Sequence, residues 1–181
     1  MRELSLHLLD IAENSIAAGA MNIQISVTED TRMDLLQMSI EDDGRGMDAD
    51  TTAKVIDPFV TSRTTRKVGL GIPLLKEAAE LCNGGLAIRS QKAVGTVLEV
   101  HFQRSHIDRM PLGDLPSTIL SLVVANPPVH WVFNYRFDDQ SYRFDDAPIK
   151  AELDGVAMTE PPVLSCLREM LETGVKEIQQ G

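Results

Sequence analysis

The fold of this chain is decided by the stretch LDIAENSIAAGA, residues Leu9–Ala20. Apolar residues recur with helical spacing from residue 4 onward, so residues 2–18 are predicted to form a helix that ends at Gly19. Asp10 and Asn14 are four residues apart and therefore share one face of that helix. A solvated polar pair on an amphipathic helix is the plainer interpretation. The other is a magnesium site, in which Asn14 binds the ion and Asp10 positions or deprotonates a water or hydroxyl.

The polar face of this helix is longer than one pair. Glu3, His7, Asp10 and Asn14 are spaced 4, 3 and 4 residues apart and lie within about 60° of one another. Two interpretations of His7 stay open: it orients Asp10 or shares its proton, or it is an exposed or edge histidine.

A second segment, Asp42-Asp43-Gly44-Arg45-Gly46-Met47, follows an apolar strand. A carboxylate at a strand end, here Asp42, is able to accept the exocyclic amino proton of adenine. Gly44 and Gly46 let the backbone approach a base closely. The alternative is an ordinary tight surface turn.

A third segment, Gly69-Leu70-Gly71-Ile72, opens a helix predicted over residues 71–82. Helix N-termini bind phosphates through free N–H groups, and glycines allow close approach. The preceding residues 61–67 carry four hydroxyls and three cations, which suggests a lid over phosphates; a solvated loop is the alternative. Thr96, at the start of a later strand, is placed to add a hydroxyl near the base.

The remaining periodicities predict strands over residues 22–28, 35–40, 86–89 and 96–102, the first two paired as a hairpin, and a short helix over 50–56. Residues 1–105 are thus expected to form an α/β two-layer sandwich, with helices on one face of a mixed, mostly antiparallel sheet. Residues 106–181 contain two apolar runs (118–125 and 130–137), a turn, a short strand and a closing helix over 161–178. We expect them to form a small α+β appendage of unknown role.

Composition excludes several function classes. The 181 residues are 43% hydrophobic and 24% charged, with a net charge of −10, so no nucleic-acid partner is expected. Cys82 and Cys166 lie far apart, which favours a reduced chain, although one long-range disulfide stays open. No signal peptide and no apolar run of about 20 residues is present, so we expect a cytoplasmic protein without a membrane segment.

The ordered set of segments resembles the GHKL superfamily (Bergerat ATP-binding fold), which includes DNA gyrase, Hsp90-type chaperones, histidine kinases and MutL-type repair proteins. Residues 9–20 resemble the N box, 42–46 the G1 box, 58–63 the F box and lid start, 69–71 the G2 box, and 95–96 the last glycine motif. From residue 57 to 102 the resemblance is strongest to the histidine-kinase catalytic domain.

The resemblance implies bound ATP and Mg2+, with Asn14 as the metal ligand, Asp42 on adenine and Asp10 in the catalytic position. The other residues that it places around the nucleotide are Gly44, Gly46, Met47, Phe59, Thr61, Ser62, Arg63, Lys67, Gly69, Leu70, Gly71, Ile72 and Thr96. Two positions depart from the family pattern. Asp10 stands where ATP-hydrolysing relatives carry Glu, and Asp43 where Asn is frequent.

Three functions remain open. The first is a histidine-kinase-like or anti-sigma-like kinase that passes the γ-phosphate of ATP to a partner protein in trans. The second is an ATP-gated switch that binds a protein partner with little or no turnover. The third is an ATPase that forms a homodimer; Asp10 and the short lid disfavour it.

Overall fold

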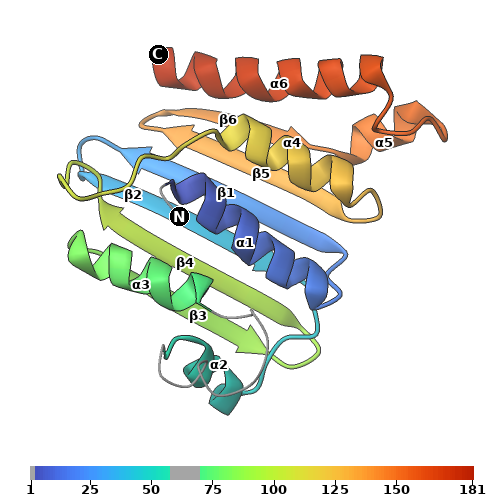
Figure 1. The fold of residues 1–181 in the computed structure, drawn as a ribbon. Helices are drawn as coiled ribbons and strands as arrows, with labels where there is room; N and C mark the ends of the chain where they lie inside the picture. Colours follow the sequence, from blue (N-terminus) through green and yellow to red (C-terminus); the bar gives the residue numbers. More distant parts are fainter. Residues whose placement is uncertain (1–2, 58–69) are drawn as a thin grey trace.

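The computed structural model describes residues 3–57 and 70–181, which form one mixed sheet covered on one face by helices (Figure 1). The elements are α1 (Leu4–Ala17), β1 (Asn22–Asp30), β2 (Leu35–Asp42), α2 (Ala49–Val55), α3 (Gly71–Leu81), β3 (Gly85–Gln91), β4 (Gly95–Gln103), α4 (Leu115–Ala125), β5 (His130–Phe137), β6 (Gln140–Asp145), α5 (Ala147–Leu153) and α6 (Pro161–Gln180). The predicted Phe59, Thr61, Ser62, Arg63, Lys67 and Gly69 lie outside the described residues.

The sheet has six strands in the order β3-β4-β2-β1-β5-β6. Strand β1 pairs antiparallel with β2 and parallel with β5, and the remaining neighbours among these strands are antiparallel. This arrangement confirms the predicted two-layer α/β sandwich with a mixed, mostly antiparallel sheet.

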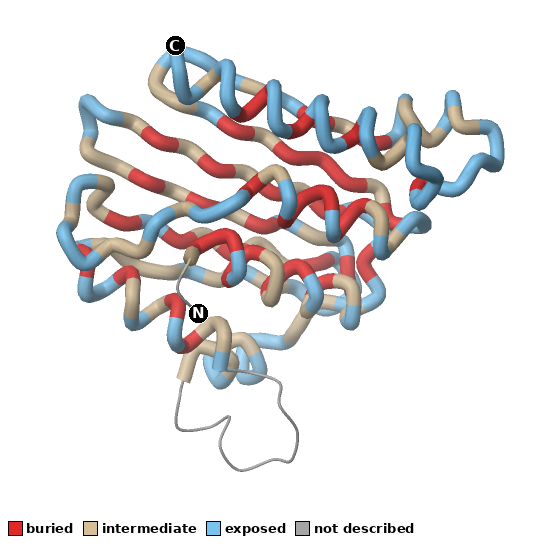
Figure 2. The backbone as a smooth tube through the Cα atoms, turned by 45° about the horizontal axis from the view of Figure 1, so that its top comes forward, coloured by how far each residue is buried: buried red, intermediate tan, exposed pale blue. Residues whose placement is uncertain are grey.

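The helix layer follows the sheet from one edge to the other. Helix α1 packs against α3 on one side and α4 on the other, and α4 in turn packs against α6 (Figure 1). Side chains alternate along the strands: Ile23, Ile25 and Val27 of β1 are buried in the core beneath the helices, whereas the residues between them are partly exposed (Figure 2). Among residues 3–57 and 70–181, no helix covers the opposite face of the sheet (Figure 1).

Local chemistry explains where the helices begin. Asp48 caps α2, its carboxylate accepting a hydrogen bond from Thr51 N at 2.8 Å. Asp114 caps α4 in the same way, accepting from Ser117 N at 3.0 Å, and Pro116 occupies the first turn. The apolar run 118–125 lies in α4, where a helix between α1, α6 and the sheet is buried on most sides.

Residues 106–181 do not stand apart from the sheet. Strand β5 pairs with β1 from Asn22↔His130 to Glu29↔Phe137, so the expected boundary at residue 105 divides one sheet and one helix layer. Trp131, Phe133 and Tyr135 contribute to the same core as the residues of α1 and β1. The aromatic alternation indicated a buried strand, but a parallel partner more than a hundred residues earlier leaves no local trace in the sequence.

Two smaller observations complete the fold. Strand β1 continues to Asp30, two residues beyond its predicted end, and the β1–β2 turn spans residues 31–34. Both cysteines are free, as the reduced-chain interpretation predicted. Within the described residues, no helix is both long enough and apolar enough to cross a bilayer.

Candidate functional site

A cavity of about 300 Å3 lies between α1 and the covered face of the sheet, close to the start of α3. Its floor and walls are mostly apolar, as is usual for a pocket that holds a planar base. The described residues that line it are Ile11, Asn14, Ser15, Ala17, Ala18, Ile40, Asp42, Arg45, Gly46, Met47, Val55, Ile72, Ile88, Thr96 and Leu98. The cavity therefore brings together six residues predicted for the nucleotide site: Asn14, Asp42, Gly46, Met47, Ile72 and Thr96.

Both carboxylate oxygens of Asp42 are held in place. Ser15 Oγ donates a hydrogen bond to Asp42 Oδ2 at 2.6 Å, and Gly44 N donates to Oδ1 at 2.9 Å. Ser15 is buried on α1, so its hydroxyl is fixed by the helix that also carries Asn14. Each oxygen keeps a free lone pair, because a carboxylate accepts about four hydrogen bonds. Asp42 is thus oriented and still able to accept from a ligand.

The loop after Asp42 is clamped between α1 and the β3–β4 turn. Gly46 has φ of +64°, and a Cβ atom there would lie 1.9 Å from the carbonyl oxygen of Gln91, so only glycine fits. Met47 N donates to Ser90 Oγ at 2.8 Å, and Ser90 Oγ lies 2.8 Å from Thr96 Oγ1. The loop is therefore fixed on the same strands that line the cavity.

Asp10 meets the start of α3. A Cβ atom built on Gly71 would lie 1.8 Å from Asp10 Oδ2, so the absence of a side chain at Gly71 makes room for this carboxylate. Leu70 is exposed at the N-cap of α3, and the N–H groups at the beginning of a helix have no intrahelical acceptor. Asp10, the catalytic candidate, is thus adjacent to the start of α3, where the phosphates are predicted to bind.

Asn14 lines the cavity, and its side chain has no hydrogen-bond partner in the described part of the chain. An amide oxygen without a competing donor, one helical turn from a carboxylate, fits the oxygen ligands that Mg2+ prefers. Glu13 is exposed and does not line the cavity, because it points about 100° away from Asn14 around the helix.

His7 is buried, so the expectation of an exposed or edge histidine is wrong. It lies on the side of α1 that packs into the protein, and burial lowers the pKa of its imidazole, while the charge of Asp10 opposes that shift. Its Nδ1 atom is buried without a hydrogen-bond partner in the described part of the chain. The idea that His7 orients Asp10 stays a prediction.

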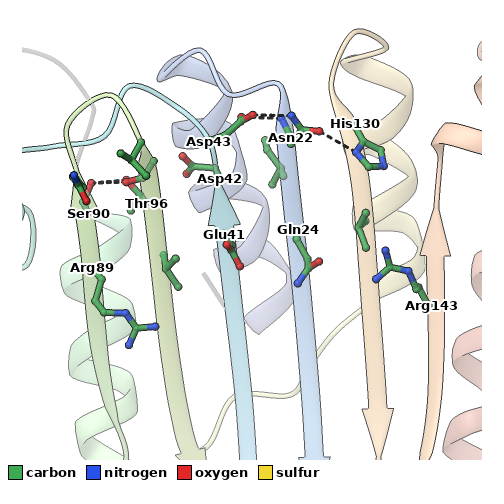
Figure 3. A pocket seen from close by; sticks show the side chains of 16 residues that line it. Asn22, Gln24, Glu41, Asp42, Asp43, Arg89, Ser90, Thr96, His130 and Arg143 are labelled. Carbon is green, nitrogen blue, oxygen red and sulfur yellow. Dashed lines mark hydrogen bonds between the residues drawn. The ribbon is translucent and has the colours of Figure 1, made fainter.

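A larger hollow, of about 640 Å3, lies on the uncovered face of the sheet near the strand ends (Figure 3). Asp42 and Thr96 border both hollows, but Asn14, Gly46 and Ile72 border only the cavity under α1. Because the predicted site residues converge there, the smaller cavity is the candidate nucleotide site.

Two residues of this site were missed in the sequence. Ser15 lies on the apolar stripe of the first helix, with Leu8 and Ile11, and a serine among apolar residues is a signal for a buried hydrogen bond. Ser90 gave no local signal, because its contacts depend on the β3–β4 register that pairs it with Thr96.

Comparison with known proteins identifies the family of this chain. Residues 2–106 match the model of the histidine kinase-, DNA gyrase B- and HSP90-like ATPases (HATPase_c). The chain belongs to this family. It accordingly contains an ATP-binding domain of the histidine-kinase-like type.

Curated relatives of this ATPase domain include sensor histidine kinases. A putative NtrY-like sensor histidine kinase of Rickettsia conorii is 27% identical over 108 residues, which cover 60% of this chain and 18% of the relative. The heme sensor protein HssS of Staphylococcus saprophyticus is 28% identical over 96 residues, which cover 52% of this chain and 21% of the relative. This chain thus spans about a fifth of the length of these two relatives.

Two solved structures have folds similar to that of this chain. The N-terminal domain of a DNA repair protein matches with a TM-score of 0.56 and 12% identity, covering 80% of this chain and 52% of that one. The MutL ATPase domain of Aquifex aeolicus, solved with ADP, matches with a TM-score of 0.50 and 13% identity, covering 96% of this chain and 70% of that one.

Proposed function

We propose that this chain binds Mg-ATP in the cavity under α1 and passes the γ-phosphate to a partner protein in trans. The observation that carries the proposal is the Asp42 carboxylate, which Ser15 and Gly44 orient at the edge of an apolar cavity. There it accepts the exocyclic amino proton of adenine, while Ile40, Ile88 and Leu98 contact the base.

The phosphates lie toward the start of α3 in this proposal. The free N–H groups of the first helical turn and its positive dipole end favour negative charge, and Gly71 allows close approach. Asn14 would ligate the Mg2+ ion, which supplies charge neutralisation on the phosphates when bound. Asp10 would orient the attacking group, since it lies against Gly71. The terminal phosphoryl group leaves ADP and bonds to the acceptor oxygen or nitrogen, whose proton is released.

A switch that binds ATP without turnover is the second candidate function. It is favoured by the side chain at position 10, because aspartate is one methylene shorter than the glutamate of ATP-hydrolysing relatives. A third, a homodimeric ATPase, requires turnover and is disfavoured by the same residue.

Incubation of the full chain with γ-labelled Mg-ATP separates these functions. A kinase transfers the label to a co-purified or added acceptor protein; a switch binds ATP and retains it intact; an ATPase releases phosphate. The Asp42→Asn variant is the control, because it should weaken ATP binding and every downstream signal together. Tight binding without label transfer to any acceptor would overturn the kinase assignment in favour of the switch.

A further inference from the structure

A chain of hydrogen bonds connects the nucleotide loop to β5 and β6 along the strand ends. Figure 3 shows its part from Asp43 through Asn22 to His130. Asn22 Nδ2 donates to Asp43 Oδ2 at 2.7 Å, and Asn22 Oδ1 lies 3.0 Å from His130 Nδ1. His130 Nε2 lies 2.9 Å from Asp145 Oδ1. These four side chains come from the end of β2, from β1, from β5 and from β6, in the order in which the strands lie.

The direction of each hydrogen bond follows from Asp43. Its carboxylate also accepts from the backbone N–H groups of Met21 and Asn22, at 2.8 and 2.9 Å. Burial raises the pKa of Asp43, but these hydrogen bonds outweigh that effect and leave it lowered, so the group is an ionised acceptor. Asn22 must therefore turn its NH2 group to Asp43 and its carbonyl oxygen to His130.

His130 consequently faces an acceptor on each side of its ring. Both contacts are hydrogen bonds only when both ring nitrogens carry a proton. A neutral ring keeps one of them and turns a lone pair toward either Asn22 or Asp145.

The surroundings of His130 are charged. The ligating atoms of His130, Asp145 and Asp146 lie within 4.8 Å of one another, but Lys150 pairs with Asp146 and the His130 nitrogens are engaged, so we assign no metal to this cluster. The charged groups around the ring are Asp145 and Arg143 of β6, Asp146 and Lys150 at α5, and Asp43 beyond Asn22.

Gly44, the residue directly after Asp43, orients Asp42, the proposed adenine ligand. Gly44 N donates to Asp42 Oδ1, and Arg45 N donates to the carbonyl oxygen of Ala18 on α1. A shift of Asp43 therefore moves the N–H group that orients Asp42.

We propose that His130 and Asn22 are positioning residues for the nucleotide loop, residues 42–47, and that they act through Asp43. The proposal rests on the proposed function, in which Asp42 binds adenine. It assigns residues 106–181 a role in the ATP site: the C-terminal strands fix the loop that reads the base. Loss of the contact between His130 and Asn22 therefore loosens Asp43 and lowers nucleotide affinity.

The test compares His130→Asn with His130→Gln in the full chain. Asparagine places an amide N–H near the position of Nδ1 and keeps the donor to Asn22, whereas glutamine reaches toward Asp145 only. Calorimetry with Mg-ADP should show affinity close to wild type for His130→Asn and about three- to tenfold weaker binding for His130→Gln.

The His101→Asn variant is the matched control, since His101 is exposed on β4 and outside both hollows. When both proteins also carry Asp43→Asn, wild type and His130→Gln should no longer differ. The hydrogen bond from Asn22 to the Asp43 carboxylate is then already lost. Amide hydrogen exchange without nucleotide gives a second readout: Gly44 and Arg45 should exchange faster in His130→Gln than in wild type.

Unchanged Mg-ADP affinity and unchanged amide exchange in His130→Gln would overturn the proposal. Failure of the wild type to bind Mg-ADP would instead refute the nucleotide assignment. The exchange rates of Gly44 and Arg45 would then still decide whether His130 positions the loop.

Discussion

Asp10 Oδ2 occupies the space that a side chain on Gly71 would take: a Cβ atom there would lie 1.8 Å from this oxygen. The two residues are 61 positions apart, and their contact brings the polar face of α1 to the start of α3. Any account of phosphate binding in this chain depends on this pair, because it joins the carboxylate of the N-terminal helix to the turn that offers free N–H groups.

Gly71→Ala is predicted to weaken Mg-ATP binding by about tenfold while the fold is retained. The added methyl group displaces the flexible end of Asp10 and blocks close approach of a phosphate, but alanine is well tolerated in a helix. Gly85→Ala is the control, since its Cβ would lie 3.5 Å from His101 Cε1, an ordinary contact. Calorimetry and thermal melting measure the two effects, and equal ATP affinity in both variants would contradict the arrangement.

Ser15→Ala is predicted to reduce adenine-nucleotide affinity by about 1 kcal/mol, because Asp42 Oδ2 loses the hydroxyl that orients it. Ser5→Ala is the matched control, as Ser5 is equally buried on α1 but does not line the cavity. Calorimetry with Mg-ADP on both variants checks this. A loss of similar size in Ser5→Ala would mean that Ser15 acts through helix packing alone.

The sequence predicted those parts of the fold and site that depend on local periodicity. Asp10 and Asn14 share a helix face, and Asp42 follows an alternating strand, so short-range spacing was enough to place them. The contacts that fix Asp42 were not predictable to the same degree. Ser15 and Asp42 are 27 residues apart, and their hydrogen bond exists only once α1 packs on β2.

The same limit explains the C-terminal part. Trp131, Phe133 and Tyr135 alternate as strand residues do, but their pairing with β1 is parallel and distant in sequence. Tertiary packing decides whether two strands so far apart in the sequence pair, and it leaves no local pattern in the sequence of either strand. The β-branched run in α4 carries weak helix propensity, and burial between α1 and α6 overrides it.

Tyr135→Phe is predicted to lower the free energy of unfolding by about 2 kcal/mol, because Glu29 is left with an unsatisfied buried oxygen. Tyr135 OH donates to Glu29 Oε1 at 2.7 Å, and Arg104 Nε donates to Oε2 at 2.8 Å. This network joins β1 to β5 across the expected domain boundary.

Unfolding of the wild type and of Tyr135→Phe should each be one transition. Fluorescence of Trp131, the chain's one tryptophan, reports on residues 106–181, and far-UV circular dichroism on the whole chain. Coincident curves are expected, since both parts share a sheet and a core. Separate midpoints would mean that residues 106–181 unfold as an independent appendage.

His7 is predicted to make the fold less stable in mild acid. Burial lowers the pKa of folded His7 below its usual 6.5, so the unfolded chain binds the proton more readily. This stability is present above pH 6.5 and is lost as the pH falls through the lowered pKa of the folded state. His7→Gln should flatten the decline, measured by urea unfolding across that range, whereas His101→Gln, at an exposed site on β4, should not. Equal pH profiles for wild type and His7→Gln would refute the role of His7.

The central claim is that Asp42 binds the adenine of ATP in the cavity under α1. Calorimetry of the full chain with Mg-ATP, in wild type and in Asp42→Asn, tests it most directly. The account predicts saturable binding by the wild type and an affinity lower by about 1–3 kcal/mol in Asp42→Asn, the worth of a charge-assisted hydrogen bond. Equal affinity in the two proteins, or no binding by the wild type at millimolar nucleotide, would contradict it.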